Sequence, residues 1–242
     1  MIKLIENTPL PSVFFTDGFS VTKIKANFMA YGCGYSFLNT WYQQNDEGEI
    51  TALIQRLETN LFIVANKNSN YNEIKDFIIA IGFTSVQAEP ETLKNLDLDF
   101  KEYQVLETKM ERECSLPPYP NIKEVFSLLY GEENKGITPV DFEGFYVDLS
   151  HKIRKDTAAA IVKESAVCVA SHITDDSAVI SGVVVQSKNR KSGLGSGILK
   201  EMTVALSGRK TFVAAEAEVA PFYIKNGFKK SYKIAIYENE EK

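Results

Sequence analysis

The stretch from Ser177 to Glu216 constrains the fold of this chain more than any other part of its sequence. It opens with a run rich in valine and isoleucine, Val179 to Val185, which is typical of a buried strand. A polar turn with three alternating glycines follows, and apolar residues then recur at helical spacing until Ser207 and Gly208. Because Thr211 to Ala215 is again apolar, the stretch predicts a strand, a glycine-rich turn, a helix and a second strand.

The glycine-rich turn has the features of an anion-binding site. Gly193, Gly195 and Gly197 carry no side chains, so the backbone can fold tightly and leave its N–H groups uncovered. Those groups lie at the start of the predicted helix, where the helix dipole places a partial positive charge. With Arg190 and Lys191 beside it, the turn suits a diphosphate, although an ordinary glycine-rich loop would have the same composition.

Two well-known phosphate motifs do not fit this turn. A P-loop ends in Gly-Lys-Ser/Thr, whereas Gly197 is followed by Ile198. The dinucleotide fingerprint of Rossmann folds reads G-x-G-x-x-G, and the last glycine of this turn comes one residue too early for it. A third pattern, Q/R-x-x-G-x-G/A, does fit the residues from Arg190 to Gly195 (RKSGLG).

That third pattern is the signature of the GCN5-related N-acetyltransferase (GNAT) superfamily, which this chain resembles in a second segment as well. Phe222 to Phe228 (FYIKNGF) is similar to the family segment that ends in Phe/Leu-Tyr-x-x-x-Gly-Phe. The two motifs stand in the family's order, with a helix and a strand between them. The resemblance implies the α/β fold of the acyl-CoA N-acyltransferases, a mixed and mostly antiparallel sheet flanked by helices.

The chain is long enough for two domains. Near its N-terminus a strand, Leu61 to Ala65, is again followed by a turn, a helix and a strand, but the turn from Asn66 to Asn70 has no glycines. Without them the backbone cannot present the same cradle of N–H groups. We expect residues 1–100 to form a smaller, degenerate GNAT-like α/β domain without a CoA site, or else an unrelated small domain, and residues 101–242 to form the GNAT acetyltransferase domain.

Periodicity and capping residues predict the remaining elements of both domains. The further expected helices span residues 19–31, 72–81, 121–130 and 141–153, and the further expected strands span residues 1–5, 49–57, 84–88, 100–110, 157–164, 166–174, 178–186 and 229–237. The strand at 100–110 is expected to be the first of the second domain.

Composition restricts the class of protein further. A net charge of -5 argues against a nucleic-acid partner. No apolar run approaches the roughly 20 residues that cross a bilayer, and the first residues do not resemble a signal peptide. The odd, widely spaced cysteines Cys33, Cys114 and Cys168 fit a reducing cytoplasm, and with only two histidines no metal site is expected. We therefore expect a cytoplasmic protein without a membrane or nucleic-acid partner.

The resemblance also implies a reaction, the transfer of an acetyl group from acetyl-CoA to a primary amine within a ternary complex. It implies that the turn amides hold the diphosphate of acetyl-CoA. It further implies that the valine-rich strand before the turn diverges from the strand that follows the helix. The free backbone groups of the valine-rich strand would then pair with the pantetheine amides and polarise the thioester oxygen. The residues assigned to the donor are Val183, Val184, Val185, Arg190, Lys191, Ser192, Gly193, Leu194, Gly195, Ser196, Gly197 and Asn226.

Tyr223 and Glu216 are the candidate catalytic residues. Tyr223 corresponds to the family tyrosine near the CoA sulfur, and a phenol keeps its proton at neutral pH and can protonate a leaving thiolate. It could also be a packing aromatic. Because the strand before the turn contains no carboxylate, Glu216 is the candidate base, which would draw a proton from the amine through water or simply face solvent.

One alternative function comes from a different class. A non-catalytic acyl-CoA-binding regulatory or sensor protein would have the same turn, and the missing carboxylate in the strand before it is consistent with this alternative. For the transferase, the acceptor amine is expected to be carried by a small molecule or a peptide.

Overall fold

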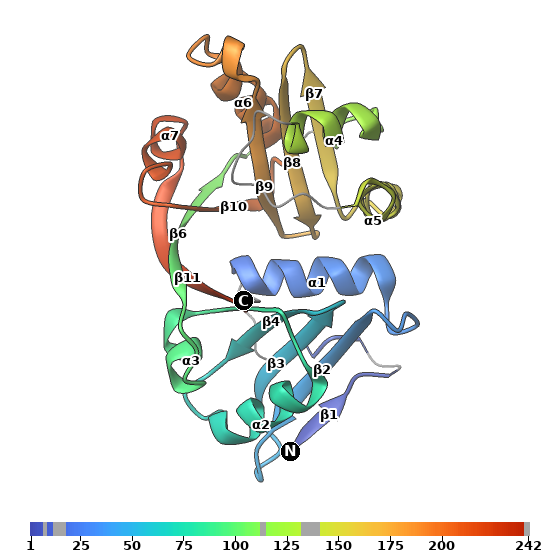
Figure 1. Cartoon of the computed structure of the whole chain (residues 1–242), viewed down its shortest axis with the longest axis vertical. Coiled ribbons are helices and arrows are strands. Elements are labelled where there is room, and N and C mark those ends of the chain that lie inside the picture. The colour runs from blue at the N-terminus through green and yellow to red at the C-terminus, as the bar shows by residue number, and fades with distance from the viewer. Residues whose placement is uncertain (7–8, 12–17, 112–114, 132–140, 240–242) are drawn as a thin grey trace. The chain divides into compact units, whose positions relative to one another are not determined.

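The computed structural model describes residues 1–6, 9–11, 18–111, 115–131 and 141–239 (Figure 1). Two compact units make up the chain. Unit 1 comprises Met1–Val105, Ala214–Ala220 and Ser231–Lys242, and unit 2 comprises Leu106–Val213 and Pro221–Lys230. The units are therefore interleaved along the sequence. Cys114 lies outside the described residues.

The elements of the described residues follow in chain order. The helices are α1 (Phe19–Tyr31), α2 (Tyr71–Ile81), α3 (Pro90–Asn95), α4 (Ile122–Tyr130), α5 (Phe142–Arg154), α6 (Leu194–Ala205) and α7 (Ala220–Lys225), with a short 3-10 turn η1 (Ser187–Asn189). The strands are β1 (Ile2–Leu4), β2 (Leu38–Gln44), β3 (Ile50–Leu57), β4 (Asn60–Ala65), β5 (Ser85–Ala88), β6 (Lys101–Lys109), β7 (Ala159–Lys163), β8 (Ala166–Ile173), β9 (Ser177–Val185), β10 (Lys210–Ala215) and β11 (Lys229–Glu238).

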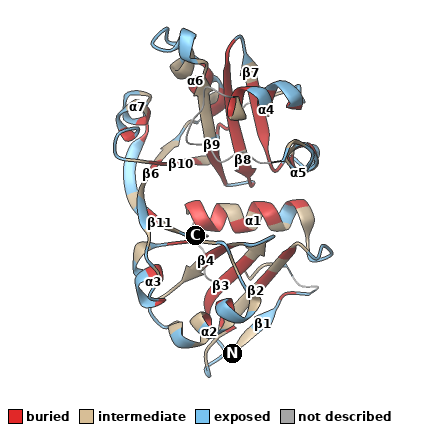
Figure 2. Ribbon diagram, in the orientation of Figure 1, coloured by how far each residue is buried: buried red, intermediate tan, exposed pale blue. Residues whose placement is uncertain are grey.

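In unit 1 the strands lie in the order β1-β2-β3-β4-β5-β11-β6. Strands β1 to β4 form an antiparallel meander, whereas β5 runs parallel to β4 and antiparallel to β11. Alternate residues of each strand point to opposite faces. Leu53 and Phe62 accordingly pack with Ile24 of α1 on one face. The other face packs against Ile74 and Ile78 of α2. Figure 2 shows the buried residues of these elements in red.

In unit 2 the strands lie in the order β6-β10-β9-β8-β7. Strands β7, β8 and β9 are antiparallel, and β10 runs parallel to β9. Helices α4 and α5 cover one face through Val125, Leu129 and Leu149, which pack on Val167 and Val169 of β8. Each unit is thus a mixed, mostly antiparallel sheet flanked by helices, as the sequence predicts.

Most elements lie within a few residues of their predicted positions, and α1 has the predicted bounds. Helix α7 is an element that the sequence did not predict. Strand β6 lies beside β10 at the edge of unit 2. Glu107 of β6 forms an ion pair with Lys210 of β10 at 3.0 Å, and the carbonyl of Met110 accepts the N–H of Gly208 at 2.8 Å. These polar contacts hold β6 at that edge.

The N-terminus of α1 is capped by a tyrosine from the last strand of unit 1. Gly18 at the N-cap position makes no side-chain hydrogen bond to the helix, and the N–H of Phe19 donates instead to the hydroxyl of Tyr232 at 2.6 Å. We expect Tyr232→Phe to lower the free energy of unfolding by about 1 kcal/mol, because the N–H of Phe19 loses its acceptor. Urea unfolding followed by circular dichroism measures the change.

The matched control is Tyr237→Phe, in the same strand, since no described residue hydrogen-bonds to the hydroxyl of Tyr237. This control is expected to leave stability unchanged. Equal losses in the two variants would contradict the capping role of Tyr232.

Candidate functional site

The turn between β9 and α6 exposes backbone amides at the start of a helix. Lys191 has a φ of 64° and Gly193 has a φ of 91°, so the chain passes through the left-handed region twice before α6 begins. The first N–H groups of a helix have no partner within it. No residue of the described part of the chain accepts a hydrogen bond from the N–H groups of Gly195 or Ser196. Together with the helix dipole, these amides suit an anion.

Side chains of the turn hydrogen-bond its own backbone. The Nε of Arg190 donates to the carbonyl of Val185 at 3.1 Å, which ties the end of the turn to the last residue of β9. The hydroxyl of Ser192 donates to the carbonyl of Asn189 at 2.6 Å. Arg190 therefore shapes the turn, while its charge and that of Lys191 stay at the exposed surface.

Gly195 lies where β9, α6 and α7 meet. A Cβ atom built on Gly195 would lie 3.4 Å from Cγ2 of Val185 and 3.6 Å from two ring atoms of Phe222. These are ordinary contact distances, so a methyl group just fits and a longer side chain must point out of the turn. Phe222 directly precedes Tyr223, so this contact also links the turn to the candidate general acid.

Strands β9 and β10 stay paired over only three residue pairs. Their parallel register runs from Ser177 opposite Lys210 to Val179 opposite Phe212. Beyond that point β9 continues to Val185 while pairing with β8, and no described strand pairs with its other edge. The backbone groups along that edge can therefore bond to an extended ligand. The splay that the resemblance implies is present in the structure.

The three valines at the end of β9 lie half-buried beside this open edge. Val184 packs against the hydrophobic cluster of α4 and α5, whereas Val185 faces Gly195 on the other side of the strand. Their side chains thus hold the strand in place beside the open edge.

Tyr223 of α7 is buried in unit 2, with 9% of its surface exposed. Its ring contacts the rings of Phe222 and Phe228 at centroid distances of 5.1 Å and 5.6 Å. Burial, with a smaller contribution from Cys168, raises the pKa of Tyr223 to about 12. No hydrogen bond joins its hydroxyl to any residue that the structure describes. The phenol is therefore a protonated donor without a protein acceptor in that part of the chain.

Asn226 closes the helix that carries Tyr223. Its N–H donates to the carbonyl of Tyr223 at 3.0 Å and its Nδ2 donates to the carbonyl of Phe222 at 2.7 Å. Asn226 therefore fixes the end of α7.

Glu216 lies in unit 1, where it forms an ion pair with Lys101 at 2.5 Å. The hydrogen bond to Glu216 is the main cause that raises the pKa of Lys101. The residues that the sequence predicts to bind the donor lie in unit 2, as does Tyr223, whereas Glu216 lies in unit 1.

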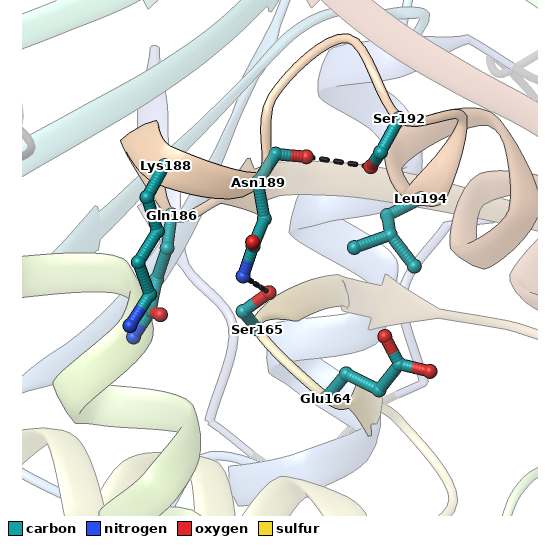
Figure 3. Close-up of a pocket in the computed structure, with 7 residues that line it drawn as sticks. All are labelled: Glu164, Ser165, Gln186, Lys188, Asn189, Ser192 and Leu194. Atoms are coloured by element: carbon teal, nitrogen blue, oxygen red, sulfur yellow. Dashed lines mark hydrogen bonds between the residues drawn. The ribbon is translucent and has the colours of Figure 1, made fainter.

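Sequence reasoning missed two residues at this site, Ser165 and Asn189. They line an open cavity of about 420 Å³ together with Ser192 and Leu194 of the turn (Figure 3). Asparagine is common in turns, so Asn189 does not stand out in the sequence as a functional residue. Ser165 comes 24 residues earlier than Asn189, and no local pattern connects the two.

Within the described ranges no group of histidine, cysteine and acidic residues could hold a metal ion. No helix among the residues described is both long and apolar enough to cross a bilayer.

Comparison with known proteins identifies the fold. No protein-family model matches the sequence, and no curated protein matches it. A GCN5-related N-acetyltransferase from Sphaerobacter thermophilus superposes with a TM-score of 0.58 at 12% identity, over 89% of this chain and 84% of that one. A GCN5-related N-acetyltransferase from Kribbella flavida has a TM-score of 0.54 at 10% identity, over 92% and 95%. A tandem GNAT protein from the clavulanic acid biosynthesis pathway has a TM-score of 0.51 at 10% identity, over 85% and 84%.

The chain therefore has the fold of the GCN5-related N-acetyltransferases. At these identities the likeness is one of fold, and it confirms the fold class that the two motifs implied.

The left-handed backbone at Gly193 yields a test of the turn. We expect Gly193→Ala to lower the free energy of unfolding by about 1 kcal/mol, because a side chain at this positive φ is strained although nothing lies within 4 Å of its Cβ. Gly197→Ala is the matched control, since Gly197 lies within α6 and its Cβ also meets nothing within 4 Å. The control is expected to be neutral or stabilising. Thermal unfolding compares the two, and equal effects would contradict the backbone assignment.

Proposed function

We propose that this protein is an acetyl-CoA-dependent N-acetyltransferase that transfers the acetyl group directly to a primary amine in a ternary complex. One observation carries the proposal. Within unit 2, uncovered turn amides, the open edge of β9 and the buried phenol of Tyr223 are joined through the contact of Gly195 with Val185 and Phe222. The names of the solved structures that share the fold support the same reaction class.

The donor would bind along the turn and the open edge of β9. The diphosphate would accept hydrogen bonds from the N–H groups of Gly195 and Ser196, with Lys191 adding charge nearby. The pantetheine amides would pair with the backbone of Val183 to Val185 like an added strand. Arg190 and Asn226 would act through the shape of the turn and of α7, by the hydrogen bonds described above.

The reaction would exchange a C–S bond for a C–N bond. The nitrogen of a neutral amine attacks the thioester carbonyl, the C–S bond breaks, and the sulfur leaves with the bonding electrons. Tyr223 gives its proton to that sulfur and is later reprotonated by the proton that the amine loses. Because burial raises the pKa of a thiol, this proton transfer requires that the CoA sulfur be desolvated when it meets the Tyr223 hydroxyl.

Glu216 keeps its proposed role as the base that draws a proton from the amine through water. Its carboxylate is already paired with Lys101. Deprotonation of the amine by bulk solvent is the alternative. The variant Glu216→Gln distinguishes these two routes. The rate at neutral pH should fall if Glu216 is the base and stay unchanged if solvent removes the proton.

We further propose that unit 1 does not bind CoA. Its corresponding turn, 66–70, occupies its own N–H groups. Asn70 accepts the N–H of Glu73 at 3.1 Å, and the side chain of Gln43 accepts the N–H of Asn70 at 2.9 Å. The hydroxyl of Ser69 accepts the N–H of Asn66 at 3.1 Å. These amides are not available to an anion, so one CoA should bind to each chain.

A cytoplasmic location is also part of the proposal. Cys33 and Cys168, the described cysteines, are both free thiols, which fits a reducing compartment.

The donor site is tested by Gly195→Glu. This substitution is expected to abolish CoA binding, because its side chain must leave the turn past Val185 and Phe222 and carries a negative charge to the anion site. Isothermal titration calorimetry measures the loss. Gly195→Ala adds only a methyl group and is expected to bind within a few-fold of the original protein. CoA binding by the Glu variant at the original affinity would overturn the donor site.

The chemical step is tested by Tyr223→Phe. We expect kcat to fall about a hundredfold with little change in the KM for acetyl-CoA, as measured by thiol release with a panel of amines. Tyr237→Phe, which removes a hydroxyl from unit 1, should leave kcat unchanged. Since the pKa of Tyr223 is about 12, its ionisation should cause no fall in kcat below about pH 10.

An unchanged kcat in Tyr223→Phe would remove the tyrosine from the mechanism. Tight CoA binding without thiol release for any amine of the panel would favour the sensor function instead.

A further inference from the structure

The glycine-rich turn is attached to the β7–β8 hairpin through Asn189. The Nδ2 of Asn189 donates to the hydroxyl of Ser165 at 2.5 Å, and the N–H of Gln186 donates to the carbonyl of Ser165 at 2.9 Å. Ser165 lies in the hairpin between β7 and β8, with 7% of its surface exposed. Figure 3 shows the Asn189 side chain reaching across the cavity wall to Ser165.

The backbone of Asn189 is bonded to the turn itself. Its carbonyl accepts the hydroxyl of Ser192 at 2.6 Å, and its N–H donates to the carbonyl of Gln186 at 2.9 Å. Ser192 lies between Lys191 and Gly193, the two residues of the turn with left-handed backbone. Asn189 thus connects a buried part of the sheet to Ser192, three residues before the uncovered amide of Gly195.

We propose that Asn189 is a positioning residue that holds the turn in its ligand-binding shape before the ligand arrives. The inference rests on the proposed function of the turn as the CoA site. A turn of exposed, glycine-containing backbone loses roughly 1–2 kcal/mol of conformational entropy for each residue that a ligand orders. A turn that the hairpin has already ordered avoids much of that cost, and affinity rises accordingly.

The proposal separates Asn189 from the residues that would touch the ligand. Asn189 acts through its bond to Ser165 on one side and through Ser192 on the other. Removing either end of the Asn189–Ser165 bond should therefore have the same effect on CoA affinity. Because the Asn189–Ser165 hydrogen bond holds the turn that would bind the donor, neither binding of the amine nor the chemical step should depend on it.

The test uses the full chain with Asn189→Ala, Ser165→Ala and the double variant. Each single substitution is expected to weaken CoA binding about fivefold, which corresponds to the loss of one ordinary hydrogen bond. The double variant should be no weaker than the singles, since both remove the same bond. The KM for acetyl-CoA should rise by the same factor while kcat and the KM for the amine stay constant. All titrations are done well below the unfolding midpoint of each variant, so that only folded proteins are compared.

Gln186→Ala is the matched control. Gln186 lines the same cavity, and no residue that the structure describes hydrogen-bonds to its side-chain amide. This control should bind CoA as the original protein does. If Gln186→Ala weakens binding as much as Asn189→Ala, the cavity contacts the ligand directly and the positioning role is overturned. Single effects that multiply in the double variant would also overturn it.

The same titrations separate this inference from the proposed function. If the original protein does not bind CoA, the proposed function fails. If the original protein binds CoA and Asn189→Ala binds it equally well, only the positioning role of Asn189 fails.

Discussion

The brief pairing of β9 with β10 is the constraint on which the site in unit 2 depends. Two parallel strands normally satisfy each other's backbone groups along their length. Here the register ends at Val179 opposite Phe212, and β9 carries an open edge from there to the turn. An exposed edge invites pairing with another extended chain. The side chains of Val184 and Val185 pack on opposite faces of the sheet, so the strand is held in place while this edge stays open.

Unit 1 has the same order of strand, turn, helix and parallel strand, but its turn has a different chemistry. Its strands β4 and β5 also stay paired over three residue pairs, up to Phe62 opposite Gln87. The difference lies in the side chains. Asparagine, serine and glutamine supply acceptors to the turn of unit 1, whereas the glycines of unit 2 supply none. The same arrangement of elements can thus present amides or cover them, depending on a few residues.

The sequence predicts the fold well because its signals are local. Valine runs, an Asn121 cap that accepts the N–H of Glu124, and the glycines of the turn each act within a few residues. The position of β6 beside β10 was not predicted, because it depends on contacts between residues about a hundred positions apart, such as Glu107 and Lys210. The assignment of the turn and of Tyr223 came from motifs. Neither local signals nor motifs could predict the contact of Ser165 with the turn, because only the folded β7–β8 hairpin brings Ser165 to the turn.

The last strand has a consequence for how the chain matures. Strand β11 completes the sheet of unit 1 by pairing with β5, as Ala235 lies opposite Ala88, and its Tyr232 caps α1. More than a hundred residues must be synthesised between these partners. Contacts of such long range form slowly. During translation the first hundred residues therefore emerge before β11, with an incomplete sheet and an uncapped helix α1.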